Sequence, residues 1–261
     1  MNRAIVWLMA PAFLMLAETV SAEPFHVPAV SNGEIRKFKV TRQSSSPDQS
    51  SIFIRPSELV VFYTVKITWA NDADNRLMIV ERREKKAAGH TRAWTFTFSA
   101  ANNLQFERYE MVESRPDGEI LGKEGGKPYF AKNRASDNIV HTLAVSEAIR
   151  GFSFKEGKQW DYMNWNPQIE ELNHVFVRVE ASEKIDVPAG SFQSWRVSLD
   201  LDLQDLLGRW RGMEFFIKPL IPKFTMWFAN TPQSPMVRFR GRFGAGKFTV
   251  VEEHKLVEMG N

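Results

Sequence analysis

Two aspartates, Asp200 and Asp202, have the clearest spacing for chemistry in this sequence of 261 residues. Two positions apart in a strand, both carboxylates point to one face and lie about 7 Å from each other. Such a pair has the geometry to bind calcium or to carry out acid–base catalysis on a sugar. The polar face of an amphipathic strand carries charges in any case, so we favour a solvated face or pairing with arginines across strands. A hydrolase that uses Asp200 and Asp202 is the remote alternative.

Other signals for catalysis or metal binding are weaker. Glu171 and His174 have the i, i+3 spacing of carboxylate-bridged iron sites, but those sites need two such motifs on facing helices and this one runs into a strand pattern. His141 lies on a predicted helix, where a single histidine is typical of a core or boundary position. The sequence contains no Cys, no Gly-x-Ser-x-Gly elbow and no complete phosphate-binding loop. We therefore expect no metal, no cofactor and no enzymatic activity.

Three arginines alternate along one segment near the C-terminus. Arg238, Arg240 and Arg242 share one face of the strand predicted over residues 236–243. Guanidinium groups in such a row can bind an anionic head group or a phosphate. They can also pair with acidic residues on neighbouring strands, and this is the interpretation that we favour.

Aromatic residues are abundant, with 20 Phe, 8 Trp and 4 Tyr. Most of them suit the core of a pleated sheet. The apolar run over residues 213–228 is different, because Pro219 and Pro222 interrupt it and prevent it from being a central strand throughout. We expect part of this run to line or cover the mouth of an apolar cavity. The candidate ligand-contacting residues are Trp94, Phe96, Phe98, Phe216, Phe224 and Trp227.

A two-residue alternation of apolar and polar side chains dominates the chain from residue 59 onward. It is especially regular along residues 195–204, and a turn over residues 186–190 joins that segment to the strand before it. The alternation is typical of antiparallel strands with one dry face and one wet face. The predicted strands cover residues 59–69, 76–84, 94–99, 104–113, 119–123, 174–185, 195–204, 213–217, 224–229, 236–243 and 247–255.

One segment has a helical period instead. Asp137 is a suitable N-cap, Gly151 a suitable end, and residues 138–150 between them carry a broad apolar stripe. A single helix among many strands packs naturally against one face of a curved sheet. The sequence therefore predicts a mainly β fold, a curved antiparallel sheet that forms a half-open barrel wrapped around one α-helix in a single domain.

The N-terminus has the anatomy of a secretory signal peptide. Arg3 provides the positive charge, residues 4–17 are apolar, and Ala22 ends a cleavage site of small residues. We expect cleavage of residues 1–22 and export. No later apolar stretch reaches about 18 residues, so we expect no transmembrane segment after signal removal. Residues 23–57 are polar and predict an irregular segment with one strand near 34–41, and residues 58–261 form the β domain.

The composition narrows the class of protein. With 43% hydrophobic and 25% charged residues, the chain is neither a disordered polyampholyte nor a collagen, a coiled coil or a polytopic membrane protein. A net charge of +3 is too small to indicate nucleic-acid binding. The absence of Cys from an exported chain of this size favours a bacterial periplasm over a disulfide-stapled extracellular module.

The predicted hairpin carries a family resemblance. Residues 185–192 read Ile-Asp-Val-Pro-Ala-Gly-Ser-Phe, and Trp-Arg-Val follows at 195–197. This segment resembles the hairpin element of a bacterial exported family, the domain of unknown function three-one-zero-eight. Met-Trp-Phe at 226–228 and Val-Arg-Phe at 237–239, separated by a polar loop, are similar to later parts of the same pattern. The resemblance implies an antiparallel sheet curled around a helix, as in the periplasmic lipoprotein carriers LolA and LolB, and it implies no catalytic residues.

These features together predict a periplasmic, non-enzymatic binding or carrier-like protein. Its ligand would be hydrophobic or amphipathic, such as a lipid or a lipoprotein acyl chain, held by aromatic residues of the concave face. The alternative is a structural or assembly factor of the envelope that binds a protein or an anionic glycan through Arg238, Arg240 and Arg242. The identity of the ligand and the oligomeric state are left open by the sequence.

Overall fold

Antiparallel strands make up most of this computed structural model. The described residues are 25–44, 59–72, 75–101, 103–127, 139–166, 171–202, 223–243 and 249–260, so the predicted signal peptide lies outside them. Side-chain alternation decides which face of a strand is buried: in β2 (Val60–Asp72), Tyr63 and Val65 are buried whereas Lys66 is exposed. The other strands are β1 (Ile35–Ser44), β3 (Asn75–Lys86), β4 (Thr91–Ser99), β5 (Gln105–Ser114), β6 (Ile120–Gly126), β7 (Ile139–His141), β8 (Gln159–Asn166), β9 (Glu171–Val187), β10 (Gly190–Leu201), β11 (Lys223–Ala229), β12 (Met236–Phe243) and β13 (Val250–Gly260).

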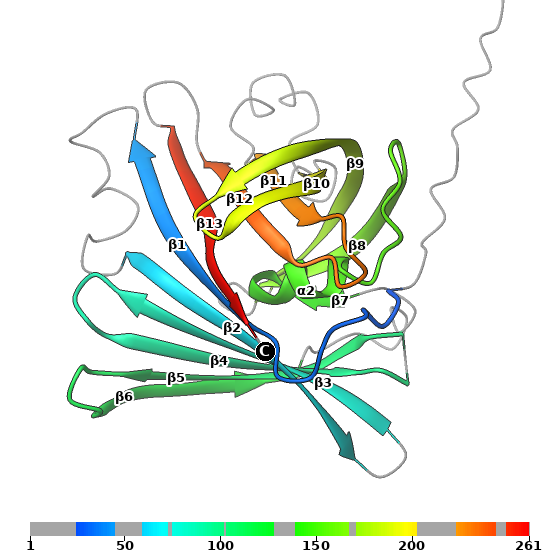
Figure 1. Cartoon of the computed structure of the whole chain (residues 1–261). Coiled ribbons are helices and arrows are strands. Elements are labelled where there is room, and N and C mark those ends of the chain that lie inside the picture. Colours follow the sequence, from blue (N-terminus) through cyan, green and yellow to red (C-terminus); the bar gives the residue numbers. More distant parts are fainter. Residues whose placement is uncertain are drawn as a thin grey trace, which may run out of the picture.

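The described strands form one sheet of thirteen, in the order β6-β5-β4-β3-β2-β1-β13-β12-β11-β10-β9-β8-β7. Neighbouring strands run antiparallel except β7 and β8, which are parallel. The order follows the chain from β1 to β6 and again from β7 to β13 (Figure 1). The first and last strands, β1 and β13, pair along their length and join the two meanders in the middle of the sheet.

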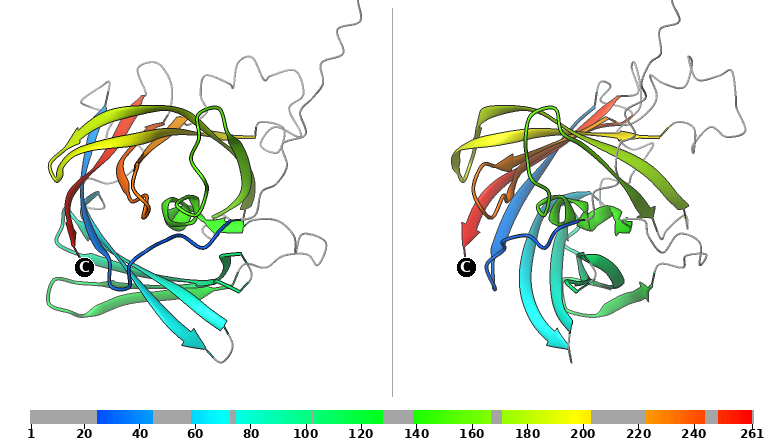
Figure 2. Two further views of the ribbon diagram at one scale, coloured as in Figure 1. Left: turned by 45° about the vertical axis from the view of Figure 1, so that its right-hand side comes forward. Right: turned by 90° about the vertical axis from the view of Figure 1, so that its right-hand side faces the viewer.

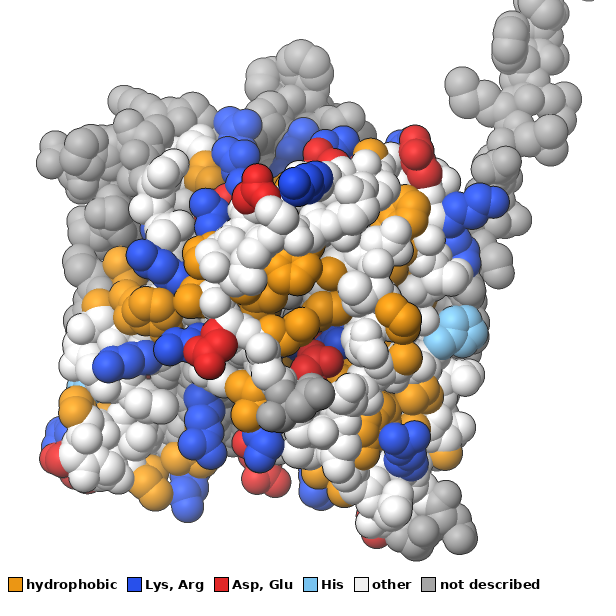
Figure 3. Space-filling view, in the orientation of Figure 1, with side chains coloured by type: hydrophobic (Ala, Val, Ile, Leu, Met, Phe, Trp, Pro, Cys, Tyr) orange, Lys and Arg blue, Asp and Glu red, His pale blue; other side chains and the backbone are white. Residues whose placement is uncertain are grey.

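The sheet curls around a short helical segment that lies on its concave side (Figure 2). The predicted mainly β fold, with an open curved sheet around one helix, is confirmed. On the face seen in Figure 3, hydrophobic side chains gather across the middle and charged side chains lie around them. Among the described residues, no helix has the length and hydrophobicity needed to cross a membrane.

The helical segment is shorter than the sequence indicates. The predicted helix covered residues 138–150, but the structure has strand β7 first, then a 3-10 turn, η4 (Thr142–Ala144), and α2 (Val145–Ile149). Ile139 and Val140 pair with Met163 and Asn164 of β8. Their β-branched side chains suit a strand, and sheet pairing overrides the helical period of the segment. His141 therefore belongs to a strand and not to a helix.

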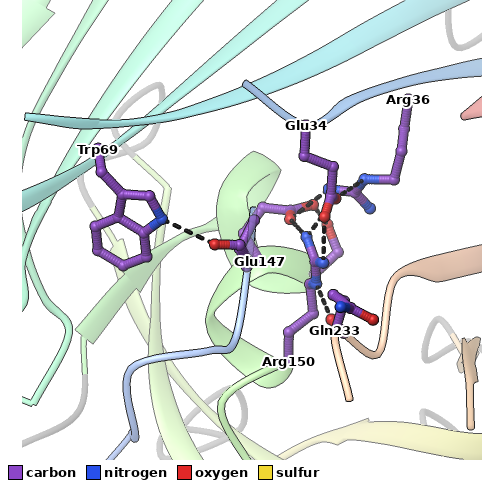
Figure 4. A network of polar contacts seen from close by, with 8 residues as sticks. Glu34, Arg36, Trp69, Glu147, Arg150 and Gln233 are labelled. Atoms are coloured by element: carbon purple, nitrogen blue, oxygen red, sulfur yellow. Dashed lines mark hydrogen bonds and ion pairs between the residues drawn. The ribbon is translucent and has the colours of Figure 1, made fainter. Parts of the chain in front are cut away.

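Four buried charged side chains fix α2 inside the sheet (Figure 4). Arg150, at the end of α2, makes a two-pronged contact with Glu34, with N–O distances of 2.8 and 2.9 Å. Glu147 of α2 accepts hydrogen bonds from Arg150, at 3.0 Å, and from Arg36 of β1. Arg150 also donates to the backbone carbonyl of Gln233 at 2.9 Å. The network ties the helix to β1 and to the loop between β11 and β12.

The charges of this network balance, with two arginines against two glutamates. Burial by itself raises the pKa of Glu147, but Arg36 and Arg150 beside it lower the pKa overall. Burial by itself lowers the pKa of Arg150, and Glu147 and Glu34 raise it overall. Glu147 and Arg150 are therefore both held in their charged forms, a state that a protein interior tolerates only when each charge is paired.

The segment before β1 closes one end of the curved sheet. The Phe25 ring lies 4.9 Å from the Phe152 ring, and Trp69 donates from Nε1 to the carbonyl of Val30 at 3.0 Å. The segment passes so close to the end of α2 that a Cβ atom at Gly151 would lie 1.8 Å from the His26 carbonyl oxygen. Gly151 is thus required by the close approach of two backbones.

Aromatic rings around His141 connect β7 and β8 to β4 and β5. The His141 ring lies 4.8 Å from Phe96, 5.2 Å from Tyr109 and 5.8 Å from Trp165, measured between ring centres. These strands are distant in the sheet order, so side-chain packing brings the two ends of the open sheet together here. Burial, with a smaller contribution from Arg82, lowers the pKa of His141 to about 3, and its Nδ1 accepts from the backbone N–H of Leu143 at 3.1 Å.

Replacement of Glu147 by Gln tests the charge network. The substitution leaves Arg36 and Arg150 with one carboxylate instead of two, and removing one partner of a buried ion pair costs about 3–5 kcal/mol. We expect the free energy of unfolding, measured by urea denaturation, to fall by that amount. Glu156→Gln at an exposed loop position is the matched control and should change it by less than about 0.5 kcal/mol. Equal effects of the two substitutions would contradict the structural role of the network.

His141 should make the protein less stable as the pH falls. The pKa of His141 is about 3 in the folded chain and about 6.5 in the unfolded chain. Between pH 6.5 and pH 3, His141 is therefore protonated in the unfolded state and neutral in the folded state. The His141 contribution thus decreases by up to about 1.4 kcal/mol per pH unit as the pH drops through this window. His141→Asn should remove that part of the slope of unfolding free energy against pH. Phe106→Leu, in the same ring cluster, should lower stability and keep the slope, and an unchanged slope in His141→Asn would refute the assignment.

Candidate ligand-binding site

A cavity of about 240 Å³ lies between the helical segment and the concave face of the sheet, and it is partly open to solvent. One wall is apolar and belongs to the second meander. It consists of alternate residues of β9 to β12, because every second side chain of a strand points to the concave face of the sheet. These residues are Val175, Leu199, Leu201, Phe224, Met226 and Phe239. Leu143, Val145 and Ser146 close the cavity from the helical side.

The adjoining wall is polar and is formed by β2, β3 and β13, the last of which pairs with β12. Tyr63, Arg82, Glu252 and His254 line it. The Tyr63 hydroxyl lies 3.1 Å from His254 Nδ1, and His254 Nε2 lies 2.6 Å from Glu252 Oε1. The other oxygen of Glu252 accepts a hydrogen bond from Arg42 of β1. A continuous chain of hydrogen bonds therefore runs from the first strands of the protein to the last one.

The electrostatics of this chain keep its members in defined protonation states. Burial by itself raises the pKa of Glu252, but hydrogen bonding to His254 and the nearby Arg42 lower it to about 2. Burial lowers the pKa of His254 and outweighs the opposite effect of Glu252. Burial also raises the pKa of Tyr63, although Arg82 opposes this. At neutral pH the chain consists of a phenol, a neutral imidazole and a carboxylate.

Arg82 places a cation beside this chain without adding net charge. Its guanidinium carbon lies 3.9 Å from the centre of the Tyr63 ring, a cation–π contact. Its Nε donates to Glu84 Oε1 at 2.8 Å. The cation of Arg82 is thus neutralised by Glu84, just as the anion of Glu252 is neutralised by Arg42. The polar wall offers hydrogen bonds and no unpaired charge.

The connectivity of Tyr63, His254 and Glu252 is that of an acid–histidine–hydroxyl triad. A nucleophile in such a triad must lose its proton, and the raised pKa of Tyr63 opposes this. Hydrogen-bond recognition therefore fits the arrangement better than nucleophilic catalysis. Within the part of the chain that the structure describes, no group of three or more His, Cys, Asp or Glu side chains is placed to hold a metal ion.

The aromatic residues predicted to contact a ligand fall into separate groups. Phe224 lines the cavity. Trp94 and Phe96 pack around His141, and Phe98 packs against Phe106 with 5.4 Å between ring centres. Phe216 and the rest of residues 213–222 lie outside the described residues.

Trp227 belongs to neither the cavity nor the His141 cluster. Its Nε1 donates to Glu183 at 2.7 Å, and Arg238 lies 4.8 Å from its ring centre. Its neighbour in β11, Met226, lines the cavity, so Trp227 points to the outer face of the sheet.

The polar wall was not among the sequence predictions, although a signal for it exists. Along β3 the inward positions run Met78, Val80, Arg82 and Glu84, so charged residues continue a buried apolar series. A charged residue at an inward position needs a partner inside the sheet. In β13, Glu252 and His254 share a face in the same way. Charged residues on the buried face of a strand are therefore the sequence pattern that indicates the polar wall.

The predicted aspartate pair lies away from the cavity. Leu199 and Leu201 of β10 face inward, so Asp200 and Asp202 face the convex side. Asp200 is exposed, and Asp202 lies 3.7 Å from Nδ1 of His174. His174 also contacts Asp161 at 2.6 Å. The two aspartates share a solvated outer face, and this placement does not favour the hydrolase alternative.

The arginine row also lies on the outer face. Arg238 donates from Nε to Glu253 of β13 at 2.8 Å, which is the cross-strand pairing favoured from the sequence. Arg240 and Arg242 are exposed. Arg238, Arg240 and Glu253 line a shallow recess of about 190 Å³ together with Thr41 and Gln43 of β1.

Comparisons with known proteins give distant structural similarities only. No family model matches the chain, and no curated protein matches it. A protein described as exported, with a YmcC-like fold, from Bacteroides fragilis NCTC 9343 is 12% identical over 91% of this chain and 100% of its own, with a TM-score of 0.39. A protein described as a lipoprotein, from Parabacteroides distasonis ATCC 8503, is 9% identical over 91% of this chain and 99% of its own, with a TM-score of 0.38. A beta-barrel-like protein of the domain of unknown function DUF1849 from Brucella abortus is 12% identical over 91% and 98%, with a TM-score of 0.47.

Proposed function

We propose that this chain is an exported, periplasmic, non-enzymatic protein that binds an amphipathic ligand in the cavity of its curved sheet. The observation that supports this proposal is that one cavity has two walls of different chemistry, an apolar wall from β9 to β12 and a hydrogen-bonding wall from β2, β3 and β13. A cavity with apolar walls and few convergent polar groups is typical of small-molecule sites. The signal-peptide pattern of residues 1–22 and the absence of Cys support the periplasm as the compartment.

The size of the cavity limits the ligand. An apolar cavity of about 150 Å³ accommodates benzene, and drug-sized pockets have about 300–1,000 Å³. A volume of about 240 Å³ lies between these values and fits one short aliphatic chain or the end of a longer one. A lipid or the acyl chain of a lipoprotein supplies such an end, with its polar part directed to Tyr63 and Arg82.

Filling the cavity should abolish binding. Leu201→Trp places a bulky ring into the apolar wall, and its partly exposed position limits the damage to folding. Ser198→Trp, on the outer face of the same strand, is the matched control. With 1-octanol as the probe in calorimetric titration of the mature protein, we expect at least about tenfold weaker binding to Leu201→Trp and unchanged binding to Ser198→Trp. No binding of the probe to the wild-type protein, or equal binding to all three, would refute the proposed function.

A second candidate function is the binding of an anionic glycan by the outer face. Lys39 of β1 lies opposite Lys255 of β13, and Lys255 lies opposite Arg238 of β12. Like charges directly opposite each other destabilise a sheet. Glu253 pairs with both Arg238 and Lys255, and Arg240 lies exposed beside them. These neighbouring cations lower the stability of the sheet, and a polyanionic partner that binds them would explain their presence. This candidate function is independent of the cavity.

Neutralising exposed members of this row should weaken glycan binding. With dextran sulfate as the immobilised probe, Lys39→Gln combined with Arg240→Gln should elute at a clearly lower salt concentration than the wild-type protein, because fewer cations contact the polyanion. Lys155→Gln combined with Lys184→Gln removes the same net charge from exposed positions elsewhere. Equal elution of the two double variants would mean that only net charge matters and would remove this candidate.

A further inference from the structure

We infer that the cavity selects a ligand whose head group is uncharged and both donates and accepts a hydrogen bond, such as a primary alcohol or a carboxamide on an aliphatic chain. This inference rests on the proposed function and names the class of its ligand. It follows from the direction of the hydrogen bonds in the polar wall and from the pairing of its charges.

The direction of the hydrogen bonds is fixed by Glu252. An ionised carboxylate only accepts hydrogen bonds, so His254 Nε2 carries the proton in the 2.6 Å contact with Glu252. Because burial keeps the imidazole neutral, His254 Nδ1 is without a proton and accepts from the Tyr63 hydroxyl, 3.1 Å away. The only proton of the hydroxyl is thereby used. Towards the cavity, the Tyr63 oxygen can act only as an acceptor, so the head group of the ligand must be a donor.

Arg82 supplies the complementary donor. One of its five N–H groups is used by Glu84, and the guanidinium lies over the ring of Tyr63 on the cavity wall. Among the described residues, no other hydrogen-bond acceptor contacts Arg82. A head group at Tyr63 can therefore also accept from Arg82. A hydroxyl group or a primary amide satisfies both requirements, whereas an ether satisfies only the second.

The charges around the cavity disfavour an ionic head group. Arg82 pairs with Glu84, and Arg42 pairs with Glu252, so that the positive and negative charges cancel within each pair. A carboxylate head would face the acceptor oxygen of Tyr63 and the negative Glu252, and an ammonium head would face Arg82. The other polar side chains of the cavity, including Tyr162 and Asn164 of β8, are uncharged amide and hydroxyl groups. An ion would lose its hydration without gaining an unpaired counter-charge.

Four probes of nearly equal size test the inference by calorimetric titration of the mature protein at neutral pH. They are 1-octanol, its isomer heptyl methyl ether, octanoate and octylammonium. Octanol should bind tightest. The ether lacks the donor and should bind about fivefold to tenfold more weakly, the value of one hydrogen bond. Both ions should bind more weakly than octanol by at least the same factor.

Tyr63→Phe should lower the preference for octanol over the ether, because it removes the acceptor oxygen and leaves only Nδ1 of His254, 3.1 Å from the position of that oxygen, to accept. The ratio of the two affinities is the readout, so a uniform loss of affinity caused by altered folding does not produce the expected result. Thr64→Val, on the outer face of the same strand, is the control and should keep the wild-type ratio.

The outcomes separate this inference from the proposed function. Tighter binding of octanoate or octylammonium than of octanol would overturn the inference while supporting a ligand cavity. Equal binding of octanol and the ether to the wild-type protein would overturn the role of the Tyr63 oxygen. A lack of binding by all four probes would overturn the proposed function itself.

Discussion

The buried network of Glu34, Arg36, Glu147 and Arg150 is the constraint on which the interior depends. A helix of five residues has too few hydrogen bonds to be stable alone, so its position must come from tertiary contacts. Glu147 and Arg150 provide them, because each pairs with a residue in or next to β1. Leaving any one of these charges unpaired would cost several kcal/mol, about as much as a domain can lose. The network thereby fixes the helical side of the cavity.

The cavity lies where two halves of different chemistry meet. The first meander and the final strand contribute Tyr63, Arg82 and His254, whereas strands β9 to β12 contribute the apolar wall. The two halves are joined at β1 and β13 by backbone pairing, and at the far edges by the rings around His141. An amphipathic interior is therefore a consequence of the topology. The polar wall is complete only when Tyr63 and Arg82 of the first meander meet His254 and Glu252 of β13.

The face on which a side chain lies follows from the sequence where the alternation is clean and does not follow where it is interrupted. Residues 226–228 are all buried, so the period of two does not reveal that Met226 faces the cavity and Trp227 faces outward. Trp94 and Phe96, both candidate ligand-contacting residues, are buried, and His141 packs against their rings. An abundance of aromatic residues indicates a large core, and it does not distinguish rings that pack together from rings that line a cavity.

The sequence by itself determined the strands and the hairpin turn, because both depend on interactions between residues close together in the chain. Alternation of side chains decides between strand and helix, and the turn over residues 186–190 defines the hairpin of β9 and β10, so the mainly β fold follows from neighbours in the chain. Tertiary structure alone decided that Ile139 and Val140 join the sheet, and that Tyr63 meets His254, 191 positions away. Such contacts depend on which strands become neighbours when the sheet curls. That choice is made by packing and charge pairing over the whole interior, and no local pattern encodes it.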